Sequence, residues 1–123
     1  MTSLYERLGR TDGIHALVNT VVGAHLVNPI IAKRFLPLAE DPKRLAAATQ
    51  HLCNFLEAGA GGPAQYTGRS MPDSHRGMNI SGEEYLAAID DVMGALTTHG
   101  MDDATKKDVL AMLYELKPMV MRL

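Results

Sequence analysis

One histidine, His75, stands in the segment from Tyr66 to Ile80, where residue types and spacing favour metal-binding chemistry. It is flanked by Met71 and Met78. A neutral imidazole is a good ligand for iron. Soft, apolar neighbours on both sides suit a flat hydrophobic cofactor such as haem. Taken alone, the local pattern more often marks a packed or hydrogen-bonded histidine, so other parts of the chain must decide between the two readings.

The composition describes one ordinary globular domain. The chain has 123 residues, of which 46% are hydrophobic and 21% charged, with a net charge of -2. This is enough for one core and gives no sign of a nucleic-acid or anionic-membrane partner. No apolar run approaches the roughly 20 residues of a membrane span, and no signal peptide is evident. The single cysteine fits a reducing compartment. We therefore expect one cytoplasmic domain over residues 1–123.

Helical periodicity and capping signals predict an all-α chain. Ser3 is expected to cap a first short helix, Asp41 or Pro42 to open a long one, and Ser81 with Glu84 to form a capping box. Pro37 and Pro42 are expected to bracket a loop. The expected helices cover residues 4–8, 11–27, 29–35, 42–58, 82–99 and, after Asp102 or Asp103, a last stretch that Pro118 kinks or ends. Residues 63–80 form a long connection, of the kind that is usually functional or disordered.

Several groups of residues occur together in a characteristic order. They are Leu4-Tyr5-Glu6-Arg7-Leu8-Gly9, Phe35, Phe55-Leu56, Gly61-Gly62-Pro63, and the block containing Tyr66, Gly68, Arg69, Met71, His75, Met78, Ile80 and Ser81. In this order and spacing the chain resembles the truncated haemoglobins, or two-over-two globins, of group I. The likeness covers nearly the whole chain. It implies a two-over-two α-helical sandwich with a short proximal helix in a long loop.

The resemblance also implies a cofactor, haem b (iron protoporphyrin IX), with His75 as its proximal iron ligand. It implies that Phe35 stacks on the haem and that Arg69 pairs with a propionate, the alternative for Arg69 being a solvated surface charge. The residues that it places around the proximal side are Met71, Met78 and Ile80.

Helical spacing puts Ala48, His51 and Leu52 on one face, which Phe55 continues. The family arrangement turns this face to the distal side of the haem. His51 falls where some members carry a histidine that binds iron, so it is a possible distal ligand; the alternative is an exposed histidine at the haem edge.

The distal pocket departs from the family pattern. Members that hold oxygen tightly usually carry a tyrosine on the second helix, at the position of Val22 here. A second position, on the distal helix, often carries a polar residue in the family; in this chain it is Leu52. With Ala48 and His51, these residues make a distal wall in which only His51 offers a hydrogen-bond donor. The loop from Leu36 to Asp41 is also longer than in close members.

The function that the resemblance implies is reversible binding of a diatomic gas (oxygen, carbon monoxide or nitric oxide). Alternatives are a six-coordinate bis-histidine protein for electron transfer or sensing, nitric oxide detoxification of the dioxygenase type, and a peroxidase-type side activity. A cofactor-free helical interaction domain is the competing class. A cellular reductase is the expected partner, and the chain is expected to be a monomer or weak dimer.

We expect structural rather than functional roles for the remaining histidines and the cysteine. We expect His15 and His25 at the surface of the second helix, and His99 at a helix end. Cys53 follows Leu52 by one residue, so it points off the haem face and reads as a buried, inert thiol rather than a sensor.

Overall fold

The computed structural model describes residues 2–64, 66 and 70–123. Its elements, in chain order, are α1 (Leu4–Arg7), α2 (Arg10–Val27), α3 (Ala32–Ala39), α4 (Pro42–Gly59), α5 (Met71–His75), α6 (Gly82–Thr98), α7 (Asp103–Leu116) and the 3-10 turn η1 (Lys117–Met119). No strand occurs among these residues; a single isolated bridge pairs Ile80 with Met121. The predicted all-α class is confirmed.

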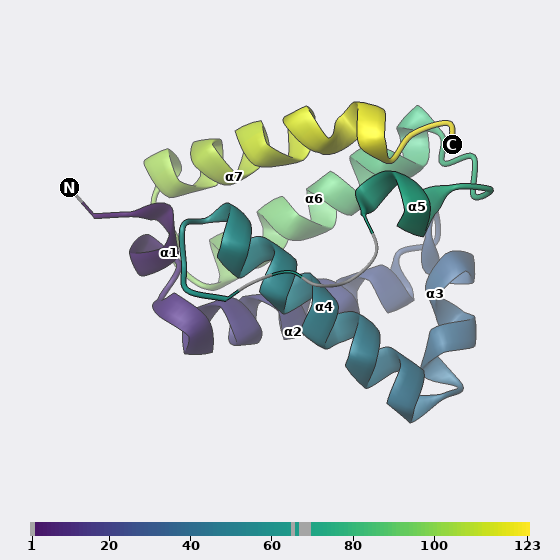
Figure 1. Ribbon diagram of the computed structural model, residues 1–123, viewed down its shortest axis with the longest axis horizontal. Helices are drawn as coiled ribbons and strands as arrows, with labels where there is room; N and C mark the ends of the chain where they lie inside the picture. Colours follow the sequence, from purple (N-terminus) through teal and green to yellow (C-terminus); the bar gives the residue numbers. More distant parts are fainter. Residues whose placement is uncertain (1, 65, 67–69) are drawn as a thin grey trace.

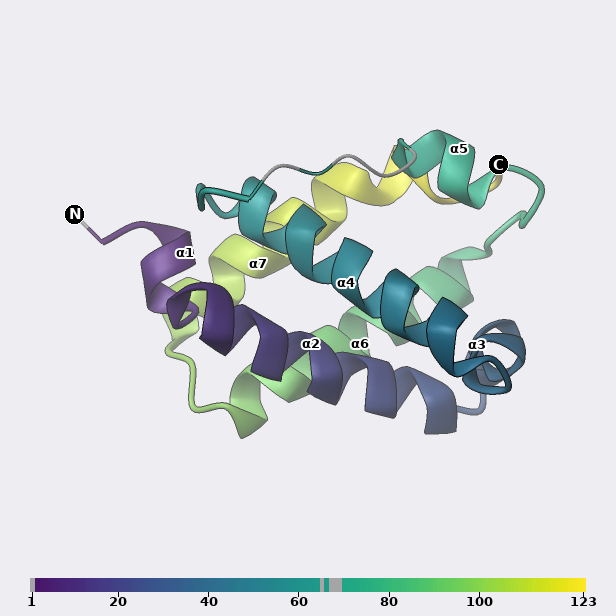
Figure 2. The same cartoon turned by 60° about the horizontal axis from the view of Figure 1, so that its bottom comes forward.

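The long helices form two layers. α2 packs against α4 in one layer, α6 packs against α7 in the other, and α2 also contacts α6 across the layers. In Figures 1 and 2 the short helix α5 lies beside the end of α7, and α3 closes the end of the molecule where α4 begins. This is the two-over-two arrangement that the sequence predicts.

Helix starts follow the capping residues named from the sequence. The side chains of Ser3, Asp41 and Asp102 each accept a hydrogen bond from an amide in the first turn of α1, α4 and α7. Ser70 does the same for α5, a cap that was not predicted from the sequence. These caps satisfy amides that lack an intrahelical partner, and they depend only on residues within one turn.

The predicted loop between Pro37 and Pro42 is wrong. Pro37 lies inside α3, which continues to Ala39. Proline lacks the amide that would bond to Lys33 four residues earlier, and that costs least in the last turns of a short, exposed helix. Both Lys33 and Pro37 are exposed. The chain turns only at Asp41, whose amide donates to the carbonyl of Leu38 at 3.0 Å.

The turn after α4 depends on its glycines. Gly61 has φ +88°, a left-handed conformation that L side chains rarely adopt. A Cβ on Gly62 would lie 2.4 Å from the ring of Tyr5 and 2.6 Å from the side chain of Glu57. The two glycines therefore let the chain leave α4 in close contact with α1.

The hydrophobic core is divided into two clusters. The larger one joins α1, α2, α4, α6 and α7, and its fully buried residues include Leu8, Ile14, Leu17 and Leu96. The smaller one consists of Ile80, Tyr85 and Val120 with partly buried neighbours that include Met78. The smaller cluster packs around the segment that follows α5. In the described residues, the larger cluster thus joins the long helices, and the smaller cluster lies at the segment that follows His75.

A hydrogen-bonded ion pair fixes the segment after α5. The Arg34 guanidinium on α3 donates to both carboxylate oxygens of Glu84, with Nη2 3.0 Å from Oε1, and also to the carbonyl of Met78 at 2.9 Å. Glu84 completes the predicted capping box with Ser81 at the start of α6. The bond from Arg34, then that from Ser81, lowers the pKa of Glu84 from 4.5 to about 2. Charge-assisted bonds of this kind are stronger than neutral ones.

We predict that Glu84→Gln lowers the free energy of unfolding at pH 7 by about 1–3 kcal/mol, since it removes the charge from a two-bond pair. Because the folded carboxyl has the lower pKa, its contribution is complete above pH 4.5 and is lost as the pH falls toward about 2. Urea unfolding between pH 7 and pH 2 should show the difference from wild type shrinking with acid. The exposed neighbour Glu83→Gln is the control; equal losses for the two variants would contradict the role of the pair.

Candidate functional site

His75 ends α5 with one ring nitrogen already engaged. Its Nδ1 lies 2.8 Å from the carbonyl oxygen of Met71, one turn earlier. A carbonyl only accepts, so Nδ1 carries a proton, and in the neutral imidazole Nε2 then has the lone pair. Metal-bound histidines usually have this arrangement, which fixes both the tautomer and the ring orientation. The geometry of the half-buried His75 is therefore compatible with metal binding through Nε2.

The residues predicted on the proximal side precede and follow His75 in the sequence. Met71 and Met78 are half-buried and Ile80 is buried. The carbonyl of Ile80 accepts from the amide of Arg122 at 3.0 Å, which ties the segment after α5 to the C-terminal end of the chain. α5 itself packs against η1. Of these side chains, Ile80 belongs to the smaller core cluster and Met78 packs against it.

The predicted distal face of α4 lies outside the main core. Ala48 and Phe55 are half-buried, and Leu52 is 37% exposed. The neighbouring Cys53, by contrast, is 2% exposed and packs into the larger cluster. Burial, and next the charge of Glu57, raise the pKa of this thiol. The structure therefore separates Cys53 from the apolar side of α4, as expected.

His51 is exposed on α4. Its ring meets the edge of Tyr66 with centroids 6.2 Å apart, and Tyr66 also meets Phe55 edge-on at 5.3 Å. The sequence did not single out Tyr66 as a site residue. Tyr66 could have been recognised from its position at the start of the block that contains His75, because the chain has few aromatic residues. The ring of Tyr66 therefore lies next to the predicted distal face of α4.

Two further predicted residues lie on α2 and α3. Val22 is half-buried against the larger cluster. Phe35 is also half-buried, and one of its faces is stacked on the ring of His25 at 4.9 Å. The expected surface position of His25 is wrong: this residue is only 7% exposed. The predicted contact of Arg69 lies outside the described residues.

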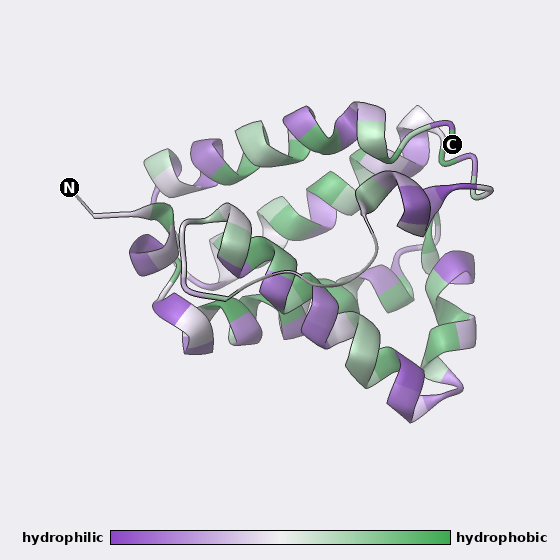
Figure 3. Cartoon of the chain, viewed as in Figure 1, coloured by the Kyte–Doolittle hydropathy of each residue, from purple (hydrophilic) through white to green (hydrophobic). Residues whose placement is uncertain are grey.

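His75 and the predicted distal face of α4 lie on helices that do not pack closely on one another. α4 packs closely against α2 and α3, α5 packs against η1, and neither helix packs closely against the other. A groove of about 210 Å³ opens between α4 and the end of α7, and is lined by Phe55, Gly59, Met112, Glu115, Leu116 and Met119. Of the predicted site residues, Phe55 alone lines this groove. Figure 3 shows hydrophobic residues recurring along α3, α4, α6 and α7. A divided core, apolar side chains left partly exposed, and an imidazole with a free nitrogen together fit haem.

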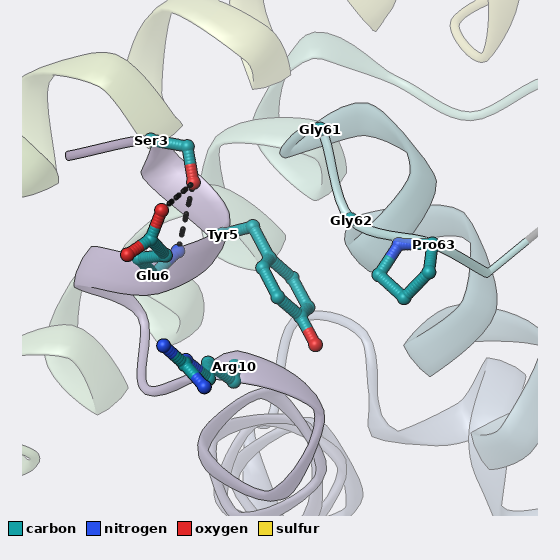
Figure 4. Close-up of a pocket in the computed structure, with 7 residues that line it drawn as sticks. All are labelled: Ser3, Tyr5, Glu6, Arg10, Gly61, Gly62 and Pro63. Atoms are coloured by element: carbon teal, nitrogen blue, oxygen red, sulfur yellow. Dashed lines mark hydrogen bonds between the residues drawn. The ribbon is translucent and has the colours of Figure 1, made fainter. Parts of the chain in front are cut away.

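A second hollow lies at the end of the molecule that carries α1 (Figure 1). It measures about 570 Å³ and is lined by Ser3, Tyr5, Glu6, Arg10, Gly61, Gly62 and Pro63 (Figure 4). None of the predicted site residues lines it. It is formed where α1 meets the glycine turn after α4, and we assign it no part in the chemistry of His75.

Comparison with known proteins agrees with this geometry. A group 1 truncated hemoglobin of Tetrahymena pyriformis is 27% identical over 119 residues, which span 88% of this chain and 94% of that protein. Another from Tetrahymena thermophila is 26% identical, spanning 82% of this chain and 79% of that protein. The crystal structure of the Tetrahymena pyriformis protein in its Fe(III) form superposes with a TM-score of 0.89 at 22% identity, covering 99% of this chain and 100% of that one.

A more distant structure shows the same fold. The 2/2 hemoglobin from Synechococcus sp. PCC 7002, in the cyanomet state and with covalently attached heme, superposes with a TM-score of 0.80 at 21% identity, covering 91% of this chain and 90% of that one. The arrangement of helices is therefore that of a truncated two-over-two globin.

The sequence profile of the bacterial-like globin family matches residues 3–122, and the chain belongs to that family. As a globin, it is a haem-based gas-binding protein. Among the described residues no single helix is long and apolar enough to cross a membrane; α2 and α3 together reach that length and composition, but a bend of 111° separates them.

Proposed function

We propose that the chain holds haem b through His75 and binds a diatomic gas reversibly on the side of α4. The observation that carries this proposal is the 2.8 Å bond between His75 Nδ1 and the Met71 carbonyl, which leaves Nε2 free for iron. The haem supplies a ferrous iron centre to which the gas binds, and a cellular reductase would keep it ferrous.

Each surrounding residue has a part in this proposal. The Met71 carbonyl orients His75, and the Arg34 bond to the Met78 carbonyl holds the following segment in place. The proposed apolar contacts, which exclude water from the cofactor, come from Phe35, Ala48, Leu52, Phe55, Met71, Met78 and Ile80. Arg69 is proposed to pair with a propionate.

We predict that His75→Gly loses most of its haem, or holds it weakly, because no other described side chain on α5 offers an imidazole. Added imidazole should restore a ligated spectrum. The measurement is the Soret absorbance of protein purified without added haem, with His15→Gly as the control for a lost histidine.

Full haem retention in His75→Gly with an unchanged spectrum would remove His75 as the ligand. A wild-type protein without any Soret band would instead support the competing class, a cofactor-free interaction domain that keeps this fold.

The proposed distal wall offers little to hold bound oxygen. Val22, Ala48 and Leu52 have no hydroxyl or amide group in their side chains. Bound oxygen develops negative charge, and a buried donor to it is worth about 1–1.5 kcal/mol or more. Carbon monoxide develops less charge, so an apolar wall favours it relative to oxygen. We therefore expect oxygen to be held weakly and lost readily, which disfavours oxygen storage, scavenging and conversion of nitric oxide among the proposed roles.

We predict that Val22→Tyr slows oxygen release by about tenfold, since the phenol supplies the missing donor and a bond of that strength corresponds to such a factor. Val22→Phe, which adds the ring without the hydroxyl, is the control. Stopped-flow oxygen dissociation measures both. If Val22→Phe slows release as much as Val22→Tyr, ring volume and not hydrogen bonding is responsible, and the distal placement of residue 22 as a donor site is wrong.

A second candidate function, a six-coordinate protein for electron transfer or sensing, is favoured by the imidazole of His51 on the same side of α4 as Leu52. The contact of His51 with Tyr66 leaves the ring at the surface, so binding to iron requires it to turn inward. Such internal binding competes with an external gas. It reduces the apparent affinity for the gas to the intrinsic affinity multiplied by the fraction of protein in the open state.

We predict a partly low-spin, six-coordinate ferric spectrum near neutral pH, fading in acid as protonation removes the imidazole lone pair. His51→Ala should become high-spin, and the exposed neighbour Gln50→Ala should remain as wild type. Identical high-spin spectra for wild type and His51→Ala would leave an apolar pocket without a distal ligand.

A further inference from the structure

A buried polar pair joins α2 to α6 at the end of the molecule that carries α3. Nδ1 of His25 lies 2.7 Å from Oδ2 of Asp91, and their side chains are 9% and 14% exposed. The sequence alone predicts His25 at the surface, because the partner that buries it lies 66 residues away in the chain. Nothing in the proposed gas-binding site uses either residue directly.

Asn28 holds the carboxylate of this pair from the other side. Its Nδ2 donates to both oxygens of Asp91 at 3.1 and 3.2 Å. Its Oδ1 accepts from the amide of Ile30 at 3.1 Å, in the turn that leads to α3. Asp91 is therefore fixed by two residues of the same chain segment, and the imidazole of His25 has a defined anchor.

The other feature of His25 is its ring contact. The imidazole is stacked on Phe35 with centroids 4.9 Å apart and an interplanar angle of 28°. Phe35 is the half-buried residue of α3 that is proposed to stack on the haem. An aliphatic side chain at position 25 would fill the same space without the desolvation cost of a polar pair, but it would not define a ring plane.

We propose that His25, anchored by Asp91, is a positioning residue that sets the ring plane of Phe35 against the haem. The inference rests on the proposed function for the haem contact, but the geometry of Phe35 can be measured without haem. Stacking restricts the tilt of Phe35 from one side, so that its other face is presented flat to a cofactor. A side chain that is already held in its bound orientation loses less conformational entropy when the cofactor binds.

The test uses the fact that the chain contains two phenylalanines. Protein labelled with 4-fluorophenylalanine gives two fluorine resonances, which Phe55→Leu assigns. His25→Leu should shift or broaden the Phe35 resonance, both without haem and with haem bound. Haem transfer to apomyoglobin should become about three- to tenfold faster, the factor expected from the loss of one aromatic stack.

His25→Gln separates anchoring from stacking, because it keeps a donor for Asp91 and has no ring. It should behave like His25→Leu, and it is the milder variant should the leucine protein fold poorly. Asp91→Ala should also shift the Phe35 resonance. His15→Leu, the same change on the same helix away from Phe35, should leave both readouts as in wild type.

Three results would overturn the proposal: an unchanged Phe35 resonance in His25→Leu and His25→Gln, a wild-type haem transfer rate in both, or the same changes in His15→Leu. A wild-type protein that takes up no haem would defeat the proposed function and the haem part of the inference, whereas the fluorine shift without haem would still decide whether His25 positions Phe35.

Discussion

The bonds that Arg34 makes join three segments that would otherwise be independent. They connect α3 to the start of α6 through Glu84, and to the segment after α5 through the Met78 carbonyl. α5 has five residues, too few to be stable as an isolated helix. Its place is therefore set by what holds its two sides: the packing on η1 and the contact of Arg34 just beyond His75. The geometry around the histidine depends on this ion pair more than on the propensity of α5.

The same helix can serve a scaffold and a site because its faces differ. Cys53 on α4 is buried in the larger cluster, whereas Leu52, one residue before it, remains partly exposed. Adjacent helical residues point about 100° apart, so α4 can contribute one face to the larger cluster and another to the predicted distal side. The smaller cluster, which contains Ile80, Tyr85 and Val120, draws on other elements, and α4 and α5 do not pack closely on one another.

Features that depend on neighbouring residues could be predicted from the sequence. The caps at Ser3, Asp41, Ser81 and Asp102 involve partners within one turn, and the two-over-two class followed from helix order and the family motifs. The burial of His25 could not, because it is decided by Asp91 on another helix. Pro37 was misjudged for a different reason: an exposed final turn tolerates a lost hydrogen bond that a buried helix would not. The roles of His75 and His51 toward iron remain predictions.

The C-terminal end of the chain is part of the segment that follows His75. The carbonyl of Leu123 accepts from the amide of Asn79 at 2.7 Å, and Met121 bridges Ile80. In Figure 1, α1 lies at the opposite end of the longest axis. Attachments to this protein are consequently not equivalent at its two ends. A purification tag, fluorophore or electrode tether fused after Leu123 would pull on the backbone next to the histidine, whereas one fused before α1 would orient the molecule with that region facing away from the support.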